Sequence, residues 1–199
     1  MTGYAFDDTE GSPGAALAAY LRQAALDPAR AVEAVAEIDD LLAVGLFSDE
    51  IADDVDLLPH INPPRGETVE RCLAVVRGHL RQFLAEPVAP STLPPQTAWE
   101  WRERFPALSH LLGAYFHQDF SLEYASDEEA LDDYVSGVSE SDLRSVANEI
   151  LEFLSINESD SLLKKSAATL GLSVCPPPGV RLRRWFGNVR ETVVHSLQG

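Results

Sequence analysis

The segment LLGAYFHQDF, residues 111–120, joins an apolar stretch to an acidic one. The residues from Leu108 to Phe116 are apolar enough for a helix that is buried in a core. Carboxylates then follow from Asp119 onward, and no lysine or arginine occurs before Arg144. We therefore expect a buried helix that leads directly into an exposed negative surface.

Acidic residues dominate the charge of the whole chain. Its 199 residues carry a formal net charge of -17, and 45% of them are hydrophobic, which is enough for a sizeable core. Such a field repels nucleic acid and acidic membrane surfaces and attracts basic proteins. We therefore expect neither a nucleic acid nor a membrane as a direct partner. High solubility, or life in a salty or acidic habitat, would give the same composition.

The cellular location can be inferred from the cysteines and from the first residues of the chain. Cys72 and Cys175 belong to no CxxC motif or Cys/His cluster, so the sequence gives no support for a zinc site or another cofactor. The first eight residues have neither the basic nor the apolar region of a signal peptide. No apolar run approaches the roughly 20 residues of a membrane span. The sequence thus predicts a soluble protein of the reducing cytoplasm.

Hydrophobic periodicity predicts an all-α fold. Ala31, Val35, Ile38 and Leu42 recur at helical spacing, and no segment shows the period of two that is typical of a strand. Residues that favour helix starts open the expected helices, at Ser12-Pro13, Asp27-Pro28, Ser48, Ser126, Ser139 and Ser159.

A proline-rich segment divides the chain. Residues 87–98 hold four prolines and read as a semi-rigid linker. We predict a mobile N-terminus at 1–11, a helical domain at 12–86 and a second helical domain at 99–199.

The two helical domains resemble divergent copies of one another. Pro63-Pro64-Arg65-Gly66 and the helix after it align without a gap with Pro176-Pro177-Pro178-Gly179 and the last helix. Upstream, Glu37-Ile38 aligns with Glu149-Ile150, and Ala19-Tyr20 with Ala114-Tyr115. The prediction is two tandem small helical-bundle repeats, of which the second carries an additional acidic segment. A chance alignment of amphipathic helices is the alternative.

Catalytic residues are hard to find in this sequence. The chain contains no Gly-rich phosphate loop, no G-x-S-x-G and no H-E-x-x-H. His110 and His117 would lie about 10 Å apart on a helix, too far to share one metal ion. His117 and Asp119 would meet only if the helix ended near Gln118. We predict a structural role for this histidine, with no catalytic, cofactor or metal site.

The acids that follow the apolar run form the candidate binding surface. Neighbouring carboxylates on a helix point about 100° apart, so they form a solvated face and no acid/base pair. A dense carboxylate face fits a basic cleft whose lysines and arginines are arranged for phosphates. The candidate residues are Glu123, Asp127, Glu128, Glu129, Asp132 and Asp133.

Several of these stretches together resemble a known family. Phe105-Pro106, the segment 111–120, the segment 127–134 and Arg184-Trp185-Phe186 resemble the immunity proteins of bacterial contact-dependent growth-inhibition systems. The resemblance covers roughly residues 99–199, with Phe120 where the family often has tryptophan. Its motif residues, which we expect to be structural, are Tyr115, Phe116, His117, Gln118, Asp119 and Trp185.

The resemblance implies a small cytoplasmic protein without enzymatic activity. Its partner would be a cognate toxin domain, basic and often a nuclease, which it binds and neutralises. We place the toxin contacts on the six acids and not on the motif. Two further hypotheses stay open: an acidic helical adaptor with no toxin partner, and a small enzyme that uses His117 and Asp119.

Overall fold

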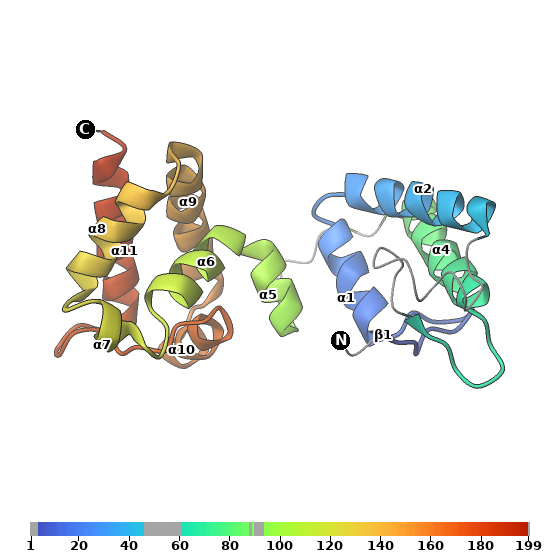
Figure 1. Ribbon diagram of the computed structural model, residues 1–199, viewed down its shortest axis with the longest axis horizontal. Helices are drawn as coiled ribbons and strands as arrows, with labels where there is room; N and C mark the ends of the chain where they lie inside the picture. Colours follow the sequence, from blue (N-terminus) through green and yellow to red (C-terminus); the bar gives the residue numbers. More distant parts are fainter. Residues whose placement is uncertain (1–3, 46–60, 88, 90–93, 199) are drawn as a thin grey trace. The chain divides into compact units, whose positions relative to one another are not determined.

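The computed structural model describes residues 4–45, 61–87, 89 and 94–198. The chain forms two compact units, Met1–Thr92 and Leu93–Gly199, and the division falls within the proline-rich segment. Regular structure in the described residues is almost entirely helical (Figure 1), which confirms the predicted all-α class. None of the described helices is both long and apolar enough to cross a bilayer.

Three helices and a short strand pair make up the described part of the first unit. The strands β1, Tyr4–Ala5, and β2, Ile61–Asn62, pair in parallel over two residues each. Helix α4 packs against both other helices. These helices are α1, Ala15–Ala24, α2, Ala29–Val44, and α4, Val69–Ala85. The helix expected after Ser48 lies outside the described residues.

The N-terminal segment caps α1. The Oδ1 atom of Asp8 accepts a hydrogen bond from the Gly14 amide at 2.6 Å, and the Oδ2 atom of Asp7 accepts one from the Ala15 amide at 3.1 Å. Ser12 was the expected N-cap, but Gly14 holds that position, because the two aspartates supply the acceptors that the first turn needs. A segment expected to be mobile thus contributes the start of the first helix.

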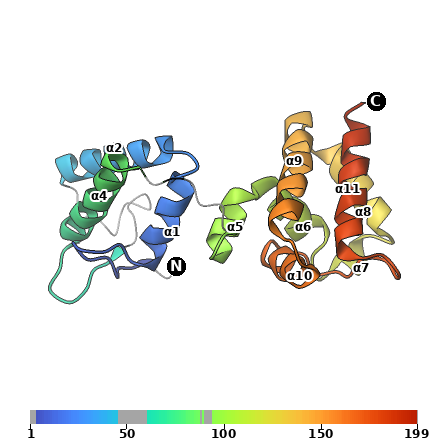
Figure 2. The same ribbon diagram turned by 180° about the vertical axis from the view of Figure 1, so that it is seen from behind.

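The second unit contains seven helices among its described residues. They are α5, Ala98–Arg104, α6, Pro106–Tyr115, α7, Phe120–Glu123, α8, Asp127–Gly137, α9, Glu140–Ile156, α10, Asp160–Thr169, and α11, Leu182–Ser196. Helix α9 packs against α6 and α11 (Figure 2), and α8 packs against the same two helices. Aromatic residues dominate the shared core: Phe105, Phe116, Phe153, Trp185 and Phe186 are almost fully buried.

Hydroxyl side chains cap four of the seven helices described in this unit. Ser126, Ser139 and Ser159 each accept a hydrogen bond from the backbone three residues on, as predicted. Thr97 and Glu100 form a full capping box that opens α5, so this helix starts at Ala98, within the segment expected to be a linker. The last residue of this segment therefore belongs to a helix.

Candidate functional site

The motif residues 115–120 form the corner between α6 and α7. The apolar helix was expected to continue to Phe116, but α6 ends at Tyr115. Phe116 is fully buried, with its ring centroid 5.7 Å from that of Phe120 and 5.0 Å from that of Trp185. Its carbonyl accepts a hydrogen bond from the Ser173 amide at 3.0 Å. The corner is thus held by ring packing and by the segment after α10.

His117 fixes the turn between the two helices. Its Nδ1 atom accepts a hydrogen bond from the Asp119 amide at 3.1 Å, and its Nε2 atom lies 3.4 Å from Oε2 of Glu123. The contact that His117 makes with Asp119 is therefore to the backbone and not to the carboxylate. Gln118 and Asp119 are exposed. This geometry favours the structural role over the enzyme hypothesis, because the imidazole is occupied by the turn.

Tyr115 anchors the acidic segment from the other side. Its ring packs edge-on against Tyr134 of α8, with centroids 5.1 Å apart, and stacks on Tyr124 at 6.3 Å. The Tyr124 hydroxyl donates to Oδ2 of Asp133 at 2.8 Å. This bond, and to a smaller extent burial, raises the pKa of Tyr124 to about 12, so the phenol remains a donor at neutral pH.

Three of the six candidate acids accept hydrogen bonds from other residues of the second unit. Asp127, at the start of α8, accepts a hydrogen bond from the indole Nε1 of Trp185 at 2.6 Å. Glu129 accepts one from the Ala125 amide at 2.7 Å, one residue before the position that a capping box would use. Asp133 is the acceptor for Tyr124. These side chains contribute to the fold of α7 and α8.

The carboxylates of the other three acids accept no hydrogen bond among the described residues, although Glu129 and Asp133 are exposed as they are. Glu123, Glu128 and Asp132 are all exposed. Glu123 lies beside His117, whereas no ion pair or hydrogen bond is found for the carboxylates of Glu128 and Asp132 among the described residues. All six acids thus lie on one short stretch, α7 to α8, and differ in whether they accept hydrogen bonds from the rest of the unit.

The sequence assigned no structural or binding role to two further residues, Leu122 and Glu149. Leu122 of α7 is 84% exposed beside the acids, although its apolar type suggested burial. Glu149 of α9 is half-buried and accepts hydrogen bonds from the amides of Ala107 and Leu108 at 3.3 and 2.7 Å, so it caps α6. Burial raises the pKa of Glu149, although those two bonds oppose the shift. Only the contact between α6 and α9 reveals this role.

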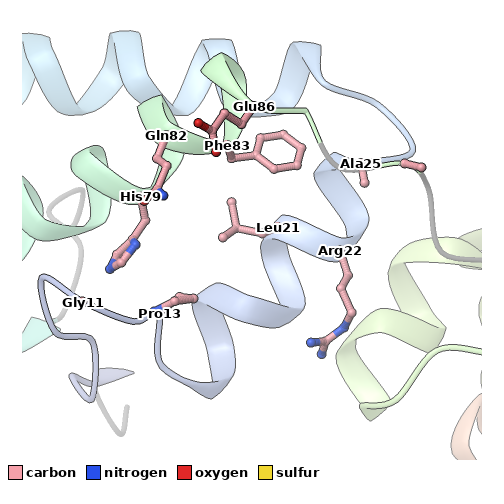
Figure 3. A pocket seen from close by; sticks show the side chains of 10 residues that line it. Gly11, Pro13, Leu21, Arg22, Ala25, His79, Gln82, Phe83 and Glu86 are labelled. Carbon is pink, nitrogen blue, oxygen red and sulfur yellow. The ribbon is translucent and has the colours of Figure 1, made fainter.

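A cavity of about 370 Å³ lies elsewhere, between α1 and α4 of the first unit. Leu21 and Phe83 lie in its middle, with Arg22 and Glu86 among its charged lining residues (Figure 3). The described residues contain no group of histidine, cysteine, aspartate and glutamate side chains placed to hold a metal ion.

One comparison with known proteins gives a match. Residues 104–193 match the model of a family described as CdiI immunity protein. No curated protein and no solved structure matches the chain. The matched range runs from the end of α5 into α11, so it includes the corner at 115–120 and all six acids. The resemblance drawn from the sequence is therefore confirmed for the second unit, which is similar over residues 104–193 to the CdiI immunity protein family.

Proposed function

We propose that this chain is an immunity protein that binds and neutralises a cognate bacterial toxin domain in the cytoplasm. The observation that carries the proposal is the family match over residues 104–193. The chain acts by binding and not by catalysis, which agrees with the use of His117 in a turn. Neutralisation then consists of covering the working surface of the toxin.

The toxin-binding surface that we propose is the exposed side of α7 and α8. Glu123, Glu128 and Asp132 present carboxylates to solvent there. A toxin domain with a basic cleft, as a nuclease has, presents the complementary potential, which speeds association and favours the correct partner. Asp127, Glu129 and Asp133 contribute to this field while also holding the helices in place.

A pair of matched charge reversals tests the proposal. Glu128 and Asp132 lie four residues apart on α8, and Glu33 and Glu37 lie four residues apart on α2; all four are exposed. The variants E128K/D132K and E33K/E37K change the net charge equally, so long-range attraction falls equally in both. A difference between them therefore reports local contact.

The assay is co-purification and titration with the toxin domain encoded next to this chain. We expect E128K/D132K to bind at least about 100-fold more weakly. The new lysines would face a basic toxin surface, and like charges that face each other across an interface cost several kcal/mol. We expect E33K/E37K to bind nearly as well as the unaltered chain. Equal loss in both variants would contradict the surface. Failure of the unaltered chain to bind or protect, with a stable complex with another protein, would favour the adaptor hypothesis.

A further inference from the structure

The three described helices of the first unit correspond in order to α8, α9 and α11 of the second. Residues 16–21 of α1 read ALAAYL, and residues 130–135 of α8 read ALDDYV. Helix α1 leads into α2 through a short connection, as α8 leads into α9. The counterpart of Tyr20 is therefore Tyr134, which replaces the pairing with Tyr115 that the sequence suggested.

The two tyrosines lie in similar places relative to the next helix. The Tyr20 hydroxyl donates to the carbonyl of Arg30, in the first turn of α2, at 2.9 Å. Tyr134 is buried close to Asp142, in the first turn of α9, which is the position that aligns with Arg30. Burial, and next the charge of Asp142, raise the pKa of Tyr134 to about 12. Tyr20 thus ties its helix to the start of the next one, and Tyr134 lies near the start of the next one.

The turn before α4 and the turn before α11 have the same geometry. The Glu67 amide donates to the Pro64 carbonyl at 3.0 Å, and the Val180 amide donates to the Pro177 carbonyl at 3.0 Å. Gly66 and Gly179, at the third position of these turns, have φ angles of +93° and +82°. Both are turns that need a positive φ at this position. The helices that follow begin at aligned residues, Val69 and Leu182.

The packing of the last helices agrees as well. Helix α4 packs against α2 and α1, and α11 packs against α9 and α8. An arginine at the aligned position of each last helix reaches the middle helix. Arg77 donates to Oδ1 of Asp39 at 2.8 Å, and Nε of Arg190 donates to the carbonyl of Ala147 at 3.2 Å. Sequence, turn geometry and packing thus relate the same three helices.

The copies differ in the charge of their first helices. Glu128, Glu129, Asp132 and Asp133 of α8 align with Gly14, Ala15, Ala18 and Ala19 of α1. A Cβ on Gly14 would overlap the Asp7 carboxylate, which would have to move to make room for it. Within this pair of first helices, the exposed carboxylates therefore occur only on α8.

We propose that residues 12–85 are a second copy of the three helices α8, α9 and α11 that lacks the carboxylates of α8, so that one chain binds one toxin domain. The binding part of this inference rests on the proposed function. The family match ends at residue 104 on its N-terminal side, so the assignment of a related fold to the first unit comes from the structure. A duplicated protein then has one binding face and not two.

Two measurements on the full chain test the inference. Calorimetric titration with the toxin domain should give one toxin domain per chain, and E128K/D132K should lose at least about 100-fold in affinity with no tight site remaining. A crystal structure should superimpose residues 12–24, 29–44 and 63–85 on 126–138, 141–156 and 176–198, with the helices in the same order and direction.

The two measurements test the one-to-one binding and the duplication separately. Two toxin domains per chain, or a tight site that survives E128K/D132K, would overturn the one-to-one binding. Helices of the first unit that run in another order or direction in the crystal would overturn the duplication. A chain that binds no toxin domain overturns the proposed function and the one-to-one binding with it, while the superposition still decides the duplication.

Discussion

At the scale of single residues, Asp127 differs from the other acids of α8 because it accepts a hydrogen bond from a buried tryptophan. The indole of Trp185 is buried, and a buried Trp N–H normally finds an acceptor, which here is the Asp127 carboxylate at 2.6 Å. The bond ties the first turn of α8 to α11. Asp127 is thus a poor choice for a test of binding alone, since its loss also loosens the unit.

The variant Asp127→Ala should therefore lower stability. We expect a loss of about 1.5–3 kcal/mol in the free energy of unfolding, because a hydrogen bond to a charged acceptor is removed and a buried donor is left alone. Asp132→Ala, on the exposed side of the same helix, should change it by less than about 0.5 kcal/mol. Urea unfolding of both variants measures this. Similar values for the two would show that the Trp185 bond contributes little.

Glu149 should make stability depend on pH. Burial raises its folded-state pKa above 4.5, its ordinary value, so the charged form is less favourable in the folded protein than in the unfolded one. Its contribution to stability is complete below the unfolded pKa and is lost as the pH rises through the folded pKa.

Comparison with Glu149→Gln isolates this effect, because the amide oxygen of glutamine can still accept from Leu108. The difference in unfolding free energy, unaltered chain minus variant, should fall as the pH is raised from about 4 toward neutrality. Denaturant unfolding at several pH values measures it. A difference that stays constant or rises over this range would contradict the raised pKa.

At the scale of elements, Gly171 sets how closely α10 approaches α6. It has a φ of +110°, and a Cβ placed on it would lie 2.7 Å from the Cα of Gly113. Both the backbone conformation and the space exclude a side chain there. Gly66 has a similar positive φ, but a Cβ would meet nothing within 4 Å.

Alanine substitutions at glycines should therefore rank in a defined order. Gly66→Ala should cost about 1–2 kcal/mol from the left-handed backbone alone. Gly171→Ala should cost clearly more, because the backbone at Gly113 must also move. Gly78→Ala, inside α4 with open space around it, should raise stability by about 0.5–1 kcal/mol. Thermal unfolding gives the ranking. A cost at Gly171 no larger than that at Gly66 would contradict the close approach.

Helix starts could be predicted from the sequence more reliably than helix contacts. Ser126 and Ser139 were identified because capping depends on residues only three positions apart. The proposed duplication pairs Tyr20 with Tyr134 and not with Tyr115, because periodicity shows which face of a helix is buried and not which helix covers it. For the same reason the sequence grouped six acids as one surface. The bonds of Asp127 and Asp133 to Trp185 and Tyr124 appear only once the helices are packed.

At the scale of the whole molecule, negative charge and binding surface are not the same thing. The net charge of -17 is a property of the entire chain, and both α2 and α8 carry exposed acids. A basic partner would be attracted by either unit at long range. Only contact geometry distinguishes them, which is why the paired reversals on α2 and α8 are more informative than a change in salt concentration.

Each unit has its own hydrophobic core. Leu80 is 1% exposed in the core of the first unit, and Leu111 is fully buried in the core of the second. Truncation of a buried leucine to alanine costs about 2–5 kcal/mol. Because none of the described buried residues belongs to both cores, we expect each truncation to destabilise one unit.

Scanning calorimetry of the full chain should therefore resolve two unfolding transitions. Leu80→Ala should lower the temperature of one of them and Leu111→Ala that of the other, each leaving its counterpart in place. If toxin binding belongs to the second unit, added toxin domain should raise only the transition that Leu111→Ala lowers, because a ligand stabilises the part that it binds. A single transition shifted by both truncations would mean that the units unfold together. A toxin-induced rise in the transition sensitive to Leu80 would instead place binding on the first unit.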